Sequence, residues 1–106
     1  MRNYRNFVKE TIRAPNEASE YLKASLDEYE KDRNIEAFLI AIRTVADAQG
    51  GITELAKKTE LNRQSLYRTL SKNGNPRLKT LDIILNSLGF KLTIEPMSSL
   101  IDSAVH

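Results

Sequence analysis

Hydrophobic residues recur at helical spacing in four separate stretches of this chain. The clearest lies between Asn34 and Gln49, where apolar residues follow one another at intervals of three and four, as on the buried face of an amphipathic helix. Pro15 marks a helix boundary, since the residue before a proline is pushed out of the helical region. The spacing predicts helices at 16–31, 34–49, two within 52–72, and 78–88. We therefore predict an all-α bundle of about five helices.

The stretch Ile52–Lys72, ITELAKKTELNRQSLYRTLSK, predicts two short helices joined by a tight turn. Leu61 falls in the turn, and Leu66 and Leu70 recur at helical spacing after it. Asn62 can cap the second helix, because its side chain can accept a hydrogen bond from a free backbone N–H in the first turn. Two helices in this arrangement form a helix-turn-helix.

The second of these helices carries polar residues on the face opposite its leucines. Arg can form two hydrogen bonds to guanine and Gln two to adenine, and a recognition helix reads bases mainly with its N-terminal residues. We predict base contacts from Arg63, Gln64 and Arg68, although exposed Arg and Gln are common on any helix. Ser65 and Tyr67 are candidate phosphate ligands, and Tyr67 could equally lie along the protein surface.

The run LAKKTELNRQSLYRTLSKNGNPRLKTLDIILNSLGFKL resembles the helix-turn-helix domain of the phage repressor/Cro (Xre) superfamily, and within it the HigA-type antitoxins of bacterial addiction modules. The LAKKT opening, the NRQSLYRTLS segment, the GNP turn and the TLDIILNSLGFKL tail carry the resemblance. It covers roughly residues 34–94, and more loosely the upstream YLKASLDEY. It implies a lambda-repressor-like bundle, with DNA backbone contacts after the recognition helix at Lys72, Asn75, Arg77 and Lys79.

The same resemblance implies the antitoxin of a type II toxin–antitoxin module. Such a protein would repress its own operon by binding operator DNA, and would bind and neutralise an mRNA-cleaving toxin of the HigB/RelE kind. A phage-type Cro/repressor regulator without a toxin partner is one alternative. An interaction module that has lost DNA binding is another.

Two positions depart from the family pattern. Glu60 stands where Gly is most common, so a left-handed backbone there would carry strain that Gly avoids. Ile52 stands where many phage repressors carry a Gln that contacts phosphate, so that contact would be missing or would pass to Thr53. We expect the fold to survive both changes, with a looser turn.

In the segment FKLTIE, Phe90, Leu92 and Ile94 alternate with polar residues, which predicts a short half-buried C-terminal strand. Unless the N-terminal arm supplies a partner, pairing with the same strand of a second subunit would hide its edge and make a homodimer. The predicted organisation is an N-terminal arm and helix at 1–33 that could bind the toxin, a DNA-binding domain with its strand at 34–95, and a flexible tail at 96–106. The first fourteen residues could form a short helix, a docking arm or a frayed terminus.

Charge is distributed unevenly over the 106 residues, whose length fits one domain. Residues 1–50 hold 8 basic and 9 acidic side chains, residues 51–79 hold 7 and 2, and residues 80–106 hold 1 and 3. The basic excess therefore coincides with the helix-turn-helix and the loop after it, as a DNA contact surface requires.

The composition also argues against several classes of protein. The absence of cysteine excludes a disulfide framework or a thiolate metal site and fits a reducing cytoplasm. No apolar run approaches the ~20 residues that span a membrane, and the N-terminus lacks the apolar core of a signal peptide. The single histidine, His106, is the last residue, so it cannot anchor a catalytic or metal site. We expect a cytoplasmic protein that is not an enzyme, has no cofactor and does not enter the membrane.

Overall fold

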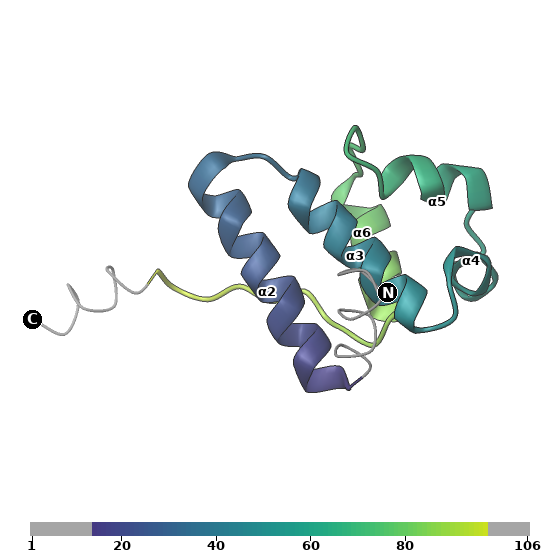
Figure 1. The fold of residues 1–106 in the computed structure, drawn as a ribbon, viewed down its shortest axis with the longest axis horizontal. Coiled ribbons are helices and arrows are strands. Elements are labelled where there is room, and N and C mark those ends of the chain that lie inside the picture. Colours follow the sequence, from purple (N-terminus) through teal and green to yellow (C-terminus); the bar gives the residue numbers. More distant parts are fainter. Residues whose placement is uncertain (1–13, 98–106) are drawn as a thin grey trace, which may run out of the picture.

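The helix α3 (Glu36–Ala48) lies at the centre of the structure, with α2 (Pro15–Asp32) beside it (Figure 1). The structure is a computed structural model and describes residues 14–97. The other helices in that range are α4 (Ile52–Thr59), α5 (Arg63–Thr69) and α6 (Leu78–Ser87). Contacts join α3 to α2 and α4, and join α4 to α5 and α6. The prediction of an all-α helical bundle is confirmed.

Backbone geometry at the helix ends explains where the chain turns. Arg33 ends α2 in the left-handed conformation, with φ at 60°. Asn34 Oδ1 then accepts a 3.0 Å hydrogen bond from the N–H of Glu36, which begins α3. After α3, the N–H of Gly51 donates to the Ala46 carbonyl at 2.8 Å, with φ at +92°, a conformation that glycine adopts without a Cβ clash. The chain can therefore turn directly from α3 into α4.

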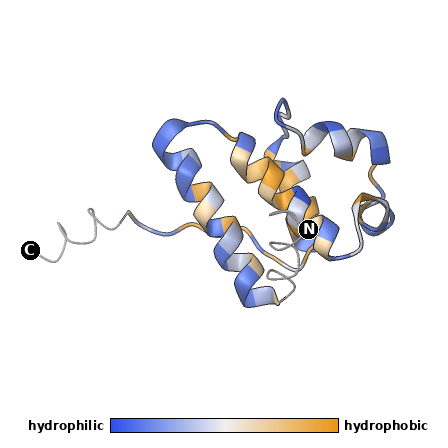
Figure 2. Ribbon diagram, viewed as in Figure 1, coloured by the Kyte–Doolittle hydropathy of each residue, from blue (hydrophilic) through white to orange (hydrophobic). Residues whose placement is uncertain are grey.

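One hydrophobic core joins the described helices, and α3 contributes more of it than any other helix. Figure 2 shows α3 as largely hydrophobic, whereas much of α2 is hydrophilic. Burying one Leu or Ile side chain stabilises a fold by about 1.5–3 kcal/mol. The buried apolar side chains are Ala18, Leu22, Phe38, Leu39, Ala41, Ile42, Val45, Ala46, Ile52, Leu55, Leu66, Leu70, Ile84, Leu85 and Leu88.

The C-terminal strand predicted from FKLTIE does not form among the described residues. Phe90 stays close to α6, where its N–H donates to the Leu85 carbonyl at 2.8 Å and its side chain packs against the core. Leu92 is 41% exposed and Ile94 is 100% exposed. A strand needs a neighbouring backbone for its hydrogen bonds, and no segment within 14–97 supplies one. The prediction of a strand is therefore wrong for the described chain.

Two groups of predictions lie outside the described residues. They concern the arm before Ala14 and the part of the tail that ends at His106. Within 14–97 the helices are too short or too polar to cross a membrane. That same part of the chain also lacks a cluster of three or more His, Asp or Glu side chains that could hold a metal ion.

Candidate nucleic-acid interface

The turn between α4 and α5 is closed by hydrogen bonds to the last turn of α4. Glu60 is left-handed (φ 61°, ψ 18°), and its N–H donates to the Ala56 carbonyl at 2.9 Å. The Thr59 hydroxyl donates to the Leu55 carbonyl at 2.8 Å and accepts from the N–H of Leu61 at 3.2 Å. A left-handed residue with a Cβ costs roughly 1–2 kcal/mol. Glu60 therefore has the strained backbone conformation that glycine would adopt more easily.

The cap that the sequence predicts for α5 is present. Asn62 is extended, and its Oδ1 accepts a 3.1 Å hydrogen bond from the N–H of Ser65. Leu66 and Leu70 are each 1% exposed and anchor the inner side of α5 in the core. The cap and these anchors together determine which face of α5 is turned to solvent.

The candidate base-reading residues Arg63, Gln64 and Arg68 are all exposed on α5. Gln64 and Arg68 lie four residues apart and therefore on the same face of α5, and Arg63 precedes Gln64 in the first turn, at the side of that face. None of them forms an ion pair with another described residue. Their polar groups are therefore available to a ligand.

Tyr67 contacts two guanidinium groups on this surface. Its ring centroid lies 5.4 Å from Cζ of Arg63 and 4.9 Å from Cζ of Arg43, which belongs to α3. The Arg43 Nε is buried without a hydrogen-bond partner in the described part of the chain, and the face of the Tyr67 ring attracts the guanidinium charge instead. Sequence reasoning missed Arg43. A lone cation within the apolar run FLIAIRTVA was the signal that could have found it.

Further candidate phosphate ligands follow α5 in a tight loop. The Gly74 N–H donates to the Ser71 carbonyl at 2.9 Å, and a Cβ on Gly74 would overlap the carbonyl oxygen of Thr69. Only glycine therefore fits at this point of the loop. The exposed polar residues that the loop and the first turn of α6 present are Lys72, Asn75, Arg77 and Lys79.

The first turn of α4 also borders this surface. Ile52 is buried in the core, so its side chain cannot reach a phosphate group. Thr53, the next residue, is exposed, as is Ser65 on α5. The sequence leaves open whether this phosphate contact is missing or passes to Thr53, and the exposure of Thr53 is compatible with the second alternative.

Comparison with known proteins assigns the chain to a family. The model of the family described as "Probable addiction module antidote protein" matches residues 5–96, which is most of the chain. The chain belongs to this family. It is also 27% identical over 78 residues to a protein of Haemophilus influenzae Rd described as uncharacterized, covering 74% of this chain and 79% of that protein. No solved structure matches the chain significantly.

Membership of this family confirms the coarse part of the functional prediction. An addiction module antidote has a cognate toxin as its partner, and the description fits a regulatory protein rather than a catalytic one. The HigA type, the Xre superfamily, DNA binding and the homodimer stay predictions.

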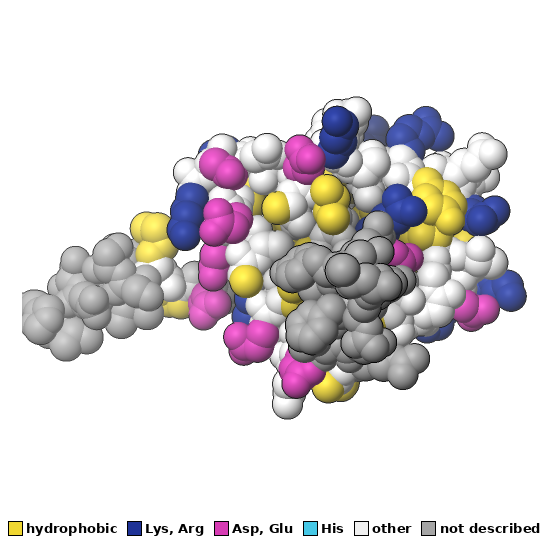
Figure 3. Space-filling model, in the orientation of Figure 1, with side chains coloured by type: hydrophobic (Ala, Val, Ile, Leu, Met, Phe, Trp, Pro, Cys, Tyr) yellow, Lys and Arg dark blue, Asp and Glu magenta, His cyan; other side chains and the backbone are white. Residues whose placement is uncertain are grey.

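Acidic and basic side chains are concentrated at different ends of the molecule. Helix α2 holds six acidic and two basic side chains, a net charge of −4, whereas residues 51–79 have a net charge of +5. Figure 3 shows Asp and Glu gathered over α2 and most Lys and Arg over the opposite end, at α4 and α5. DNA phosphates would therefore be attracted to the α5 end and repelled by α2.

Proposed function

We propose that this protein is the antitoxin of a type II toxin–antitoxin module and a sequence-specific repressor of its own operon. The observation that carries the DNA-binding part is the exposed face of α5, on which Arg63, Gln64 and Arg68 lie together. A major groove about 12 Å wide admits an α-helix, and these side chains match guanine and adenine edges. The surrounding basic residues would bind phosphates and supply affinity that is independent of sequence.

The proposed repressor acts as a homodimer of the HigA type. Two α5 helices related by a two-fold axis would read half-sites about 34 Å apart on an inverted-repeat operator. The exposed Leu92 and Ile94 are apolar side chains that a second copy could bury. A monomeric mass in light scattering at micromolar concentration would contradict this part of the proposal.

The proposed partner is an mRNA-cleaving toxin of the HigB/RelE kind, which the antidote binds and neutralises. The family description supports the role of antidote. The acidic side chains of α2 and the basic ones of residues 51–79 lie apart, which supports separate surfaces for toxin and DNA. The basic end favours DNA phosphates, whereas the acidic end favours a ligand of positive charge.

Fluorescence anisotropy across a salt series tests the DNA-binding part. We expect the full chain to prefer the DNA upstream of its own gene over a scrambled duplex by about 10³-fold or more, with affinity falling steeply as salt rises. Equal and weak binding to both duplexes, with and without the toxin, would refute the repressor and favour a pure interaction module.

Co-purification with the product of the adjacent gene tests the antitoxin part. We expect a stable complex, and growth of cells that express both proteins under conditions where the toxin alone stops growth. Specific DNA binding without any such complex would favour a phage-type repressor that has no toxin partner.

A further inference from the structure

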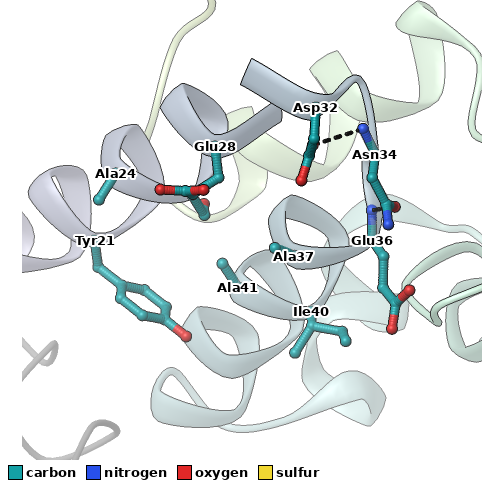
Figure 4. Close-up of a pocket in the computed structure, with 10 residues that line it drawn as sticks. Tyr21, Ala24, Glu28, Asp32, Asn34, Glu36, Ala37, Ile40 and Ala41 are labelled. Carbon is teal, nitrogen blue, oxygen red and sulfur yellow. Dashed lines mark hydrogen bonds between the residues drawn. The ribbon is translucent and has the colours of Figure 1, made fainter. Parts of the chain in front are cut away.

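A groove of about 660 Å³ lies between α2 and α3, and none of its lining residues belongs to α4, α5 or α6. Alanines line it from both sides, Ala24 on α2 and Ala37 and Ala41 on α3 (Figure 4). A methyl group is too short to fill the space between two helices, so the groove stays open. Ile40, which is 41% exposed, adds a larger apolar side chain at its margin.

Three carboxylates border this apolar floor, Glu28 and Asp32 from α2 and Glu36 from α3 (Figure 4). Glu28 pairs with Lys31 at 3.5 Å, but both side chains are exposed, and such surface pairs contribute little to stability. Asp32 accepts a hydrogen bond from the N–H of Asn34 at 2.9 Å. Neither Asp32 nor Glu36 forms an ion pair within residues 14–97. The groove therefore combines an apolar floor with a net negative rim.

A basic protein segment fits this combination. Nucleic acid does not, because three carboxylates and the net charge of −4 on α2 would repel its phosphates. An enzyme that cleaves mRNA must hold RNA phosphates with Lys or Arg side chains. Carboxylates form charge-assisted hydrogen bonds with the same cations, and those of Arg are often bidentate.

We propose that this groove binds a basic segment of the cognate toxin. Lys or Arg side chains of the toxin meet Glu28, Asp32 and Glu36, and a small apolar side chain covers the alanines. The inference rests on the proposed function and deepens it, because the antidote then neutralises the toxin by occupying cations that would otherwise hold RNA. The groove shares no lining residue with α5, so the toxin does not occupy the helix that is proposed to read DNA.

Titration calorimetry of the full chain against the purified toxin of the same operon tests the groove. Glu28→Lys reverses a charge on the rim, and Ala37→Leu fills the floor with a good helix former without changing charge. Asp27→Lys is the matched control, because Asp27 is the exposed neighbour of Glu28 on α2 and does not line the groove. We expect both groove variants to raise the toxin Kd by about tenfold or more, and the control to change it by less than about threefold. Circular dichroism and operator binding should stay at wild-type levels.

Other results would overturn the groove in distinguishable ways. Equal losses from Glu28→Lys and Asp27→Lys would show diffuse attraction rather than a defined site. If both groove variants bind the toxin as tightly as the unchanged chain does, the toxin binds elsewhere and the proposed function stays intact. If the unchanged chain does not bind the toxin at all, both the groove proposal and the proposed antitoxin function are overturned. Unchanged toxin affinity with an altered mass of the free chain would identify a second copy as the occupant.

Discussion

We expect the backbone effect of the substitution Glu60→Gly to stabilise the protein by about 0.5–1 kcal/mol. Glu60 has φ 61° and ψ 18°, and a residue with a Cβ in this left-handed conformation costs roughly 1–2 kcal/mol. Glycine avoids that cost but loses more conformational freedom on folding, which offsets roughly 0.5–1 kcal/mol. The difference between these two terms gives the expected gain, and for a chain of this size it raises the thermal midpoint by about 2–8 °C.

A charge effect must be separated from this backbone effect. Glu60 follows the C-terminus of α4, where a negative charge is unfavourable and its removal contributes about 0.3–1 kcal/mol. Glu60→Ala removes the carboxylate but keeps the Cβ, so it should show the charge effect alone. Urea unfolding followed by far-UV circular dichroism, at one fixed protein concentration, measures both variants. A glycine variant no more stable than the alanine variant would refute the strain at this turn.

Arg33 offers a second comparison, because it has nearly the same backbone conformation (φ 60°, ψ 20°) at the end of α2. Its side chain pairs with Glu30 at 3.4 Å, and its Cζ lies 5.6 Å from the centroid of the Tyr29 ring. Arg33→Gly removes these contacts together with the strain. It should therefore stabilise the protein less than the backbone effect at Glu60, which is the difference between Glu60→Gly and Glu60→Ala. A gain equal to that difference would mean that the contacts and charge of Arg33 contribute nothing.

Substitutions around α5 give three further tests. Arg63→Ala should cost about 1–3 kcal/mol of operator affinity and relax discrimination at one base pair. Lys79→Ala should weaken binding to operator and scrambled duplexes alike and flatten the salt dependence in anisotropy. Unchanged operator affinity of Arg63→Ala would mean that another side of α5 faces the DNA major groove. Arg43→Met removes the cation beside Tyr67 and should lower the free energy of unfolding by about 0.5–1 kcal/mol in urea titrations. Unchanged stability would mean that this contact contributes nothing to the fold. Asn62→Ala should lower the free energy of unfolding by about 1 kcal/mol in urea titrations, whereas Asn62→Ser should nearly preserve it, since both Asn and Ser cap helices well.

The helices could be predicted from the sequence because each buries one periodic face in a shared core. The expected range 34–49 agrees with α3 to within two residues, and the difference arises because Asn34 forms a hydrogen-bonded turn before the helix. The cap at Asn62 was also predictable, because its hydrogen-bond donor and acceptor lie only three residues apart in the sequence. Local spacing carries enough information for features of this kind.

Features that depend on distant segments were not predictable in this way. The alternation in FKLTIE favours a strand, but a strand also needs a partner backbone, which no local pattern can supply. The contact between Arg43 and Tyr67 joins α3 to α5, whose relative placement follows from core packing. The groove likewise arises only when Ala24 of α2 is brought opposite Ala37 and Ala41 of α3.

Helix α3 separates the two proposed binding surfaces, and this makes the two proposals independently testable. Ala37 lines the groove beside α2, while Arg43 contacts Tyr67 on α5. Substitutions at Glu28 and Arg63 lie on different helices and share no described partner, so their effects on stability should be close to additive. Glu28→Lys should lose toxin binding and keep operator binding, and Arg63→Ala should do the reverse. A variant that carries both substitutions should lose toxin binding and operator binding while its far-UV spectrum stays that of the wild-type chain. Loss of both binding activities in either single variant would mean that toxin and DNA share one surface.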